Sequence, residues 1–360
     1  MLQYFEKEKI FRAVNGGEAK IIVKTNNRSY SRLVIDVLVC DGSENYPYMV
    51  NNEEELIQMD QNKSYKLNND IELTNNWTPI SFNGVLDGNH HAIKGLKITD
   101  DEIANTVNVG FISILGGTIK NLQLVDVDIN VSKAVTLGAF AGRVNGNKTI
   151  IDNVEFQYGL IQTSEATGTI TSTNTVTSSK VGGVAGSINN SAKIDRCGFD
   201  GKLAVTGSSI VAGGIAGENN NSVISESYAR EVVDNGTYSS TVFGGIVGEN
   251  SGKDGNLYDC YFYAKQEPSR NSQTEIAGIV YRKSGDGLVT GCYYGGKMNA
   301  IGGSSTSGLV NSGDLKSTSN SYLDDSIQGF KNSNKFITTQ EISTGEIRTW
   351  NFNGVWTLTS

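Results

Sequence analysis

The chain has 360 residues, and glycine supplies 42 of them, well above the ~7% of an average protein. The net charge of −8 and the sequence pI near 5.0 argue against a nucleic-acid partner, because nucleic acids are bound by basic surfaces. The sequence has no apolar run of the roughly 18 residues that a membrane span needs, and no apolar h-region of a signal peptide is visible after Met1.

Residues 1–42 contain three apolar stretches with strand composition, which are Ile10–Val14, Ala19–Lys24 and Leu33–Val39. These stretches resemble the last strands of a bacterial immunoglobulin-like domain of group 2. Such a domain usually needs a longer chain, so the resemblance implies a partial immunoglobulin-like β segment. It also implies that the chain belongs to a longer modular surface protein.

A short helix is predicted after this segment. Asn52 is a suitable N-cap residue, and Glu55 follows three positions later, as in a capping box. The helix should continue through Leu56 to Met59. We expect it to cover the first turn of the structure that follows, because the end of a strand stack exposes edges that need shielding.

A six-residue pattern with apolar first, fourth and sixth places returns seven times from residue 93 onward, with Ser227 as an exception at a fourth place. The repeats begin 26 to 43 residues apart, at Ile93, Ile119, Ile151, Ile194, Ile224, Leu257 and Val289. A repeat of this size marks a solenoid, in which no unit can bury its apolar face alone.

The third place of each repeat is expected to form a corner between two strands. The apolar residues are separated by three positions and then by two, whereas a straight strand turns every second residue to the same face. All three side chains can point inward only if the chain bends at the third place. Most occupants tolerate left-handed backbone well, namely Gly95, Asn121, Asn153, Asp259 and Gly291. Arg196 and Glu226 are less suited to it, so the bend should be made differently in their repeats.

Glycine-rich apolar segments precede most of these repeats. They are Gly138–Gly142, Gly182–Gly186, Gly213–Gly217 and Gly244–Gly248, with weaker copies at Gly110–Ser113 and Ala277–Tyr281. We expect short strands whose small residues let neighbouring turns approach closely. Each unit would then hold about three strands, as in a parallel β-helix.

The glycine-rich segments resemble the GLUG motif, which occurs in repeats of large bacterial surface and secreted proteins. The stretch from Tyr65 to Ile93, which includes Trp77-Thr-Pro79 and Asp87-Gly88, resembles the region that commonly precedes such repeats. The resemblance spans residues 48–300. It implies a right-handed parallel β-helix, a bacterial cell-surface or extracellular location, and a place in adhesin-like proteins or beside immunoglobulin-A-cleaving peptidases. It does not imply one activity.

The sequence therefore predicts an all-β chain with three parts. Residues 1–42 form the partial immunoglobulin-like segment, residues 47–300 the GLUG-repeat right-handed parallel β-helix with its short capping helix, and residues 301–360 a C-terminal cap. The longest step between repeats contains Gln162–Lys180, which is rich in serine and threonine. We expect that stretch to leave the coil as a hairpin or loop.

Three of the four cysteines, Cys197, Cys260 and Cys292, occupy the inward fourth place of their repeats. They are expected to be free, buried thiols, since small apolar residues suit that place.

No catalytic residue, metal site or cofactor is predicted. The two histidines, His90 and His91, are adjacent, and we expect one to pack near the first turn. Acidic residues near the start of the coil could line a groove or bind calcium, although carboxylates facing water are the more common case; they are Asp70, Asp87, Asp100 and Asp101.

A tyrosine strip is the best candidate for a binding surface. Tyr228, Tyr261 and Tyr293 occupy the outward fifth place of three successive repeats, beside Tyr258 and Tyr263. Tyrosines offer rigid apolar area with a polar tip, which suits a sugar ring or a protein partner. The alternative is that the rings stabilise neighbouring strands or lie beneath a loop.

Three hypotheses about function follow. The first is a non-enzymatic β-helical module that presents surfaces for adhesion or acts as a spacer, with a glycan or a host or matrix protein as partner. The second is a carbohydrate-active β-helix, a polysaccharide lyase or hydrolase with an acidic groove. The third is an accessory region of a larger surface protease.

Overall fold

The structure, a computed structural model, describes most of the chain. The described ranges are 2–5, 10–13, 16–24, 32–103, 107–151, 154–173, 178–207, 209–230, 233–235, 241–264 and 275–296, with five short strands between residues 306 and 337. Within these ranges, no helix has the length and apolar character that a membrane crossing requires.

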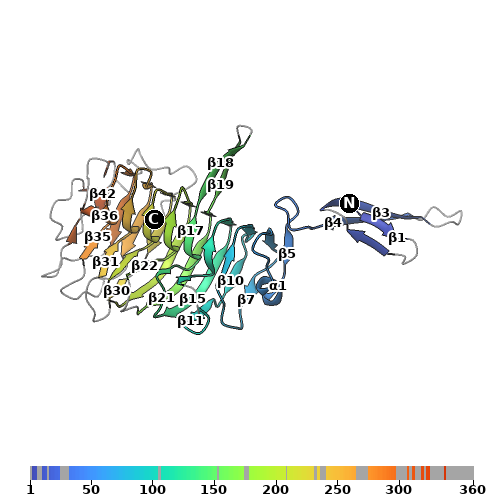
Figure 1. Ribbon diagram of the computed structural model, residues 1–360, viewed down its shortest axis with the longest axis horizontal. Coiled ribbons are helices and arrows are strands. Elements are labelled where there is room, and N and C mark those ends of the chain that lie inside the picture. The colour runs from blue at the N-terminus through green and yellow to red at the C-terminus, as the bar shows by residue number, and fades with distance from the viewer. Residues whose placement is uncertain are drawn as a thin grey trace.

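From Tyr48 onward the chain winds into a parallel β-solenoid (Figure 1). One turn consists of four strands in sequence, β22 (Ser179–Gly182), β23 (Ala185–Asn189), β24 (Lys193–Asp195) and β25 (Gly198–Val205). Each strand pairs in parallel with its equivalents one turn earlier and one turn later, so four sheets run along the coil. The predicted all-β solenoid is confirmed, but a full turn has four strands rather than three.

The first and second sheets, which contain β22 and β23, hold seven and eight strands. The other strands of the first sheet are β12 (Asn108–Val109), β16 (Thr136–Leu137), β26 (Ile210–Gly213), β31 (Thr241–Gly244), β35 (Glu275–Ala277) and β39 (Thr306–Ser307). Those of the second are β8 (Ile80–Phe82), β13 (Ile112–Leu115), β17 (Ala141–Asn145), β27 (Ala216–Asn220), β32 (Val247–Ser251), β36 (Val280–Lys283) and β40 (Val310–Ser312).

The third and fourth sheets, which contain β24 and β25, hold ten and twelve strands. The third also has β5 (Tyr48–Val50), β6 (Tyr65–Leu67), β9 (Val85–Asp87), β14 (Thr118–Lys120), β20 (Leu160–Gln162), β28 (Val223–Ser225), β33 (Asn256–Tyr258), β37 (Val289–Thr290) and β41 (Thr318–Ser319). The fourth also has β7 (Ile71–Glu72), β10 (Ala92–Lys94), β11 (Lys97–Thr99), β15 (Gln123–Val131), β21 (Glu165–Ser172), β29 (Tyr228–Arg230), β30 (Val233–Asn235), β34 (Tyr261–Ala264), β38 (Tyr293–Gly296), β42 (Tyr322–Asp324) and β43 (Phe336–Ile337).

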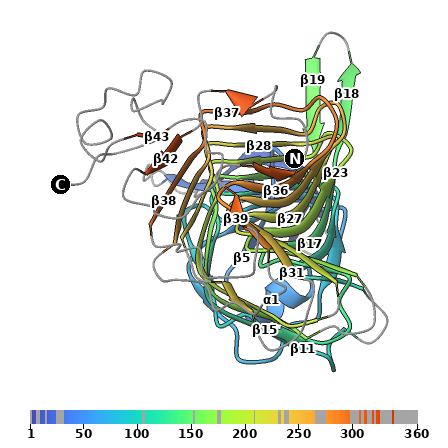
Figure 2. The same cartoon turned by 90° about the vertical axis from the view of Figure 1, so that its left-hand side faces the viewer.

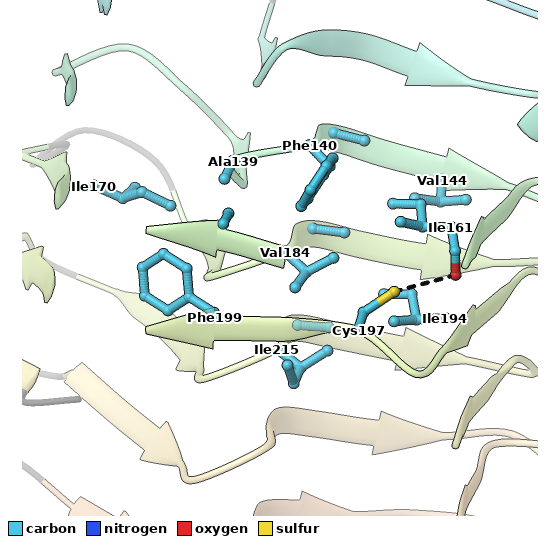
Figure 3. Packing of buried hydrophobic residues seen from close by; sticks show 14 of the residues in the cluster. Ala139, Phe140, Val144, Ile161, Ile170, Val184, Ile194, Cys197, Phe199 and Ile215 are labelled. Carbon is cyan, nitrogen blue, oxygen red and sulfur yellow. Dashed lines mark hydrogen bonds between the residues drawn. The ribbon is translucent and has the colours of Figure 1, made fainter. Parts of the chain in front are cut away.

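The core fills the inside of the coil with stacked ladders of apolar side chains. One ladder in the third sheet is fully buried and consists of Ile119, Ile161, Ile194, Ile224, Leu257 and Val289. In Figure 3, Phe140, Val184 and Ile215 stack on successive turns in the same interior as Ile161 and Ile194. Burial of each such side chain contributes ~1.5–3 kcal/mol, so the ladders are the main source of the coil's stability.

Cysteines occupy the inward places that the repeat assigns to them. Cys197, Cys260 and Cys292 are buried, and none of the three forms a disulfide bond. The Cys197 thiol donates to the carbonyl oxygen of Ile161 on the preceding turn, at 3.3 Å (Figure 3). Burial raises the pKa of the Cys197 thiol to about 12, so the group stays protonated and acts as a small core residue.

The N-terminal residues form antiparallel hairpins outside the coil, as expected for a small β segment. β1 (Leu2–Phe5) pairs with β2 (Ile10–Ala13), and β3 (Gly17–Lys24) pairs with β4 (Arg32–Val39). Apolar side chains of the second hairpin face solvent, and Leu33 and Leu38 are each 58% exposed.

The predicted helix is present as α1 (Glu53–Ile57), at the N-terminal end of the coil (Figure 2). The Asn52 side chain accepts a hydrogen bond from the Glu55 backbone N–H at 2.9 Å, and Leu56 is buried in the core. The Glu55 carboxylate accepts from the Asn51 N–H rather than from Asn52, so the cap begins one residue early.

The corner between the third and fourth sheets has left-handed backbone on every described turn from Asn121 to Gly291. The φ angles are 52° at Asn121, 48° at Thr163, 52° at Arg196, 49° at Glu226, 50° at Asp259 and 68° at Gly291. The expectation that Arg196 and Glu226 would bend differently is therefore wrong. Their N–H groups donate to carbonyls of the next turn, and this pairing holds the corner in place.

Two of the seven repeats do not lie where the pattern placed them. Ile93 pairs with Leu124 and Ile98 with Ile129, so the first repeat lies in the fourth sheet, past this corner. Ile151 lies in an antiparallel hairpin outside the coil, and Ile161 takes the place between Ile119 and Ile194.

The long step between repeats is explained by that hairpin, formed by β18 (Asn147–Ile151) and β19 (Val154–Tyr158). The hairpin projects away from the coil in both views (Figures 1 and 2). The stretch Gln162–Lys180, which we expected to leave the coil, instead contains β21, and β21 pairs with β25 over eight residues.

The glycine-rich segments form the corner between the first and second sheets, rather than single strands as expected. A Cβ atom on Gly183, Gly214 or Gly245 would lie 2.3, 2.2 or 2.0 Å from a carbonyl oxygen of the following turn. Real Cβ atoms do not approach so closely. Glycine is therefore needed because the backbones of successive turns touch at this corner, as the sequence predicts.

Beyond residue 300, β39, β40, β41 and β42 extend the four sheets by one strand each. The apolar tail residues of the predicted C-terminal cap, such as Ile342, Trp350 and Trp356, lie outside the described residues.

Candidate ligand-binding face

The outer face of the fourth sheet carries one continuous row of side-chain positions directly after the left-handed corner. Strand register places these residues side by side on successive turns: Gln123, Glu165, Gly198, Tyr228, Tyr261, Tyr293 and Tyr322. Their neighbours, Phe199, Ala229, Phe262 and Tyr294, point inward and are buried. This alternation is the period of two that a strand imposes, and it puts the tyrosines outside.

The tyrosines of the row contact one another. The Tyr261 and Tyr293 rings stack with centroids 5.6 Å apart and planes 13° apart, and Tyr263 lies 6.3 Å from Tyr261. Their exposure differs, since Tyr263 is 39% exposed and Tyr293 only 5%. Tyr293 therefore supports the stack, while Tyr261 and Tyr263 offer the accessible area.

Tyr258, which the sequence also assigns to the tyrosine strip, lies in the third sheet on the other side of the corner at Asp259. It pairs in register with Ser225 and Thr290 and is half-buried. The structure thus brings Tyr261, Tyr263 and Tyr293 together and places Tyr258 on an adjoining face.

Tyr228 is next to Tyr261 in the row, but its ring lies toward the preceding turns. Its ring covers Gly198, where an added Cβ atom would come within 2.5 Å of Tyr228 Cζ. The Tyr228 hydroxyl donates a hydrogen bond to the Glu165 carboxylate, two turns back along the coil, and the Arg230 guanidinium lies 4.9 Å from the ring centroid. Burial, together with the neighbouring Glu165, raises the pKa of Tyr228, so the hydroxyl remains a donor.

A pocket of about 240 Å³ lies beside Tyr228. Its lining includes His90, Gln123, Thr163, Glu165, Arg196 and Tyr228, which come from five successive turns of the coil. The sequence does not predict this pocket. Its apolar pattern points to Ile151 rather than Ile161 on this turn, so Glu165 does not fall in the same predicted row as Tyr228. The one signal available was Gly198, the only glycine at the outward fifth place of a repeat.

Arg196, the guanidinium that lines the pocket, is paired with the Asp195 carboxylate. The Arg196 Nε and Nη2 atoms each lie 3.1 Å from Asp195 Oδ2. Burial alone would raise the pKa of Asp195, but hydrogen bonds from Ser225 and Gln162 and the ammonium group of Lys193 lower it below its ordinary value. Asp195 is therefore a carboxylate that Arg196 and Lys193 share.

The acidic residues near the start of the coil do not form one site. Asp70 contacts Lys94 and His91, at 3.0 and 3.3 Å, and Asp100 accepts hydrogen bonds from Ser132. Asp87 accepts from Asn121 at 3.1 Å. In the part of the chain that the structure describes, no group of three or more His, Cys, Asp or Glu side chains is arranged to hold a metal ion.

No protein-family model and no curated protein matches this sequence. Solved structures that share its fold include the following two. A putative immunoglobulin A1 protease from Bacteroides ovatus is 20% identical with a TM-score of 0.52, over 87% of this chain and 90% of that one. An IgA1 protease is 12% identical with a TM-score of 0.58, over 91% of this chain and 26% of that one. This chain therefore spans about a quarter of the longer protein. At these identities the likeness shows a shared β-solenoid fold.

Proposed function

We propose that this chain is a non-enzymatic β-helical module of a bacterial secreted or cell-surface protein, and that it binds a ligand on the outer face of its fourth sheet. The observation that carries the proposal is the outward row in which Tyr261 stacks on Tyr293 beside the exposed Tyr263. Accessible aromatic area with polar tips, held rigidly by a stack of strands, is a preferred surface for recognition.

The location in this proposal is supported by the solved structures that share the fold, both described as immunoglobulin A1 proteases or putative ones. It is also supported by the glycine-rich corners, which resemble GLUG repeats of bacterial surface proteins. The contacts between turns at Gly183, Gly214 and Gly245 give that glycine pattern a structural reason.

The test is binding of the purified chain to a glycan array and to host matrix proteins, with and without calcium. The double variant Tyr261→Ser/Tyr263→Ser should lose at least about tenfold in affinity, since each buried aromatic anchor contributes more than ~1.4 kcal/mol. Tyr48→Ser is the matched control, because Tyr48 is also exposed but lies on β5 at the N-terminal end. Equal binding by the double variant and the wild type would exclude the tyrosine strip as the binding surface. If the chain binds neither glycans nor matrix proteins saturably, a spacer role remains as its function.

A second candidate is an accessory region of a larger protease that holds the protein substrate. The observation that favours it is the match of this chain to 26% of an IgA1 protease. Immunoglobulin A1 should then bind the isolated chain saturably, and the Tyr261→Ser/Tyr263→Ser variant should weaken that binding. Failure of immunoglobulin A1 to bind, with glycans bound normally, would remove this candidate.

The carbohydrate-active alternative has a direct assay. If the pocket beside Tyr228 cleaved polysaccharide, incubation with its ligand would release new reducing ends or unsaturated products, and Glu165→Gln would abolish their release. Under the non-enzymatic proposal, a bound saccharide is recovered unchanged.

A further inference from the structure

The pocket beside Tyr228 has the composition of a sugar-binding subsite. We propose that it binds one unit of a neutral saccharide, whose remaining units run along the coil over Tyr261 and Tyr263. This inference rests on the proposed ligand-binding role of the fourth sheet and adds a specific subsite and a ligand class to it.

One missing side chain lets Tyr228 form a wall of the pocket. Gly198 has no side chain, so the Tyr228 ring occupies the space above it and reaches Glu165 on the turn before Gly198. Pockets for drug-sized ligands have ~300–1,000 Å³. The 240 Å³ found here therefore suits a smaller unit, such as a single sugar ring.

The rim of the pocket offers hydrogen-bonding groups that no protein group uses. Among the described residues, the side chains of His90, Gln123 and Thr163 make no hydrogen bond with the protein. An imidazole, an amide and a hydroxyl provide both donors and acceptors. A sugar ring presents hydroxyl groups that need both, and the Tyr228 ring, which lies over Gly198 and under the Arg230 guanidinium, adds apolar area to the lining.

The charges around the pocket select a neutral ligand. Arg196 is held by the Asp195 carboxylate, and the Glu165 carboxylate already accepts from Tyr228. An acidic sugar in the pocket would face the Glu165 carboxylate, and Arg196, the guanidinium that lines the pocket, already shares the Asp195 carboxylate with Lys193. Burying a further negative charge there is unfavourable, whereas hydroxyl groups can bond to the free sites of each charged group.

The tyrosine strip begins one turn beyond Tyr228, in the same row as the pocket. Gly198, Tyr228 and Tyr261 are consecutive in one row, each ~4.8 Å from the next turn. A saccharide chain that places one unit in the pocket can therefore extend along the coil axis toward Tyr261 and Tyr263. The Arg230 guanidinium lies over the Tyr228 ring, and Arg230 pairs in register with Tyr263 on the next turn.

The experiment is calorimetric titration of the full chain with neutral hexose tetrasaccharides of α and β linkage and with oligouronides of the same length. We expect micromolar to millimolar binding of a neutral tetrasaccharide and at least about tenfold weaker binding of oligouronides. Glu165→Gln and Gly198→Ala should each weaken the neutral ligand by about tenfold or more, because the first removes a charged acceptor and the second displaces the Tyr228 ring.

Glu249→Gln, on β32 of the second sheet, is the control for charge removal and should bind as the wild type does. Thermal unfolding of each variant should stay close to that of the wild type, since Glu165→Gln keeps the shape of the side chain and an added Cβ at the buried Gly198 meets the Tyr228 side chain first. Tyr228→Phe provides a second measurement. It keeps the ring and removes the bond to Glu165, so it should weaken binding less than Gly198→Ala.

The outcomes separate this inference from the proposed function. Loss of binding in Tyr261→Ser/Tyr263→Ser with unchanged binding in Glu165→Gln and Gly198→Ala would overturn the subsite and leave the binding face intact. Tighter binding of oligouronides than of neutral sugars would overturn the ligand class. Binding of matrix proteins or immunoglobulin A1, with no saccharide bound, would overturn the inference while supporting the wider function.

Discussion

At the scale of single residues, the left-handed corner shows tertiary structure overriding local preference. Glycine and asparagine adopt this backbone readily, but the corner also holds Thr163, Arg196 and Glu226. Left-handed backbone costs a non-glycine residue roughly 1–2 kcal/mol. The fold tolerates this because each corner N–H donates to the next turn and the flanking apolar side chains stay buried.

Replacement of Glu226 by asparagine should therefore stabilise the protein. Glu226→Asn lowers the backbone energy at φ 49° and removes repulsion with Asp259, for a gain of about 1 kcal/mol. Glu226→Gln is the control, because it removes the charge but keeps an unfavourable side chain for this backbone. Denaturant unfolding at pH 7 measures both, and equal gains in the two variants would show that charge alone matters.

Asp259 provides a pH-dependent prediction. Burial, with a smaller effect of Glu226, raises its pKa above the ordinary value of 3.8. Between 3.8 and the raised value the folded state holds more protons than the unfolded state, so stability from this group falls as pH rises through that interval. Asp259→Asn should thus stabilise the protein at pH 7 and lose this advantage below about pH 4. A gain that is independent of pH would show that only the backbone preference of asparagine contributes.

At the scale of elements, the hairpin β18–β19 is an insertion into one turn of a regular coil. The connection from the second to the third sheet is short on both neighbouring turns. Two residues join Leu115 to Thr118 on the preceding turn, and four residues join Ile188 to Lys193 on the following turn. A Cβ atom on Gly159 would lie 2.7 Å from the Gly146 Cα. One peptide bond, which spans ~3.8 Å between Cα atoms, can therefore close the gap.

Deletion of residues 147–158, with Gly146 joined to Gly159, should leave the coil folded. The shortened turn would have three connecting residues, a length between those of its two neighbours. We expect the melting temperature to change by only a few degrees and saccharide binding to be unchanged. Circular dichroism and calorimetry measure this. Loss of cooperative unfolding would show that the hairpin stabilises the coil.

The same insertion explains why the sequence pattern failed on this turn. Ile151 to Phe156 matches the apolar pattern better than the true corner, Ile161 to Ala166, where Ser164 and Ala166 take the inward places. The turn at Ile224 also has small residues there, Ser227 and Ala229. Hydrophobic periodicity cannot separate a projecting apolar hairpin from a core strand, because only pairing with neighbouring turns distinguishes them.

At the scale of the whole molecule, the described residues show few polar contacts between the N-terminal hairpins and the coil. The Gly16 N–H donates to Asp41, and Lys63 donates to the Asp41 carbonyl oxygen. β3 and β4 pair only with each other, and their exposed apolar side chains include Ile22, Leu33 and Leu38.

Removal of residues 1–39 should therefore leave the stability of the coil nearly unchanged, by about 1 kcal/mol or less, since exposed apolar side chains contribute little burial. The truncated chain should also bind less of an apolar dye and self-associate less, because a large exposed apolar surface promotes association. Calorimetry, dye fluorescence and light scattering test this. A large fall in melting temperature would show that the hairpins shield the N-terminal end of the coil.

The sequence by itself determined the solenoid, its capping helix, the inward cysteines and the outward tyrosines, because these follow from a local period and from residue preferences that repeat on every turn. Only the tertiary structure decided which turn holds Ile161, that Arg196 and Glu226 take left-handed backbone, and that Tyr228 leans over Gly198 to reach Glu165. These features depend on the register between turns, and register is set by the packing of residues about 30 apart in the chain.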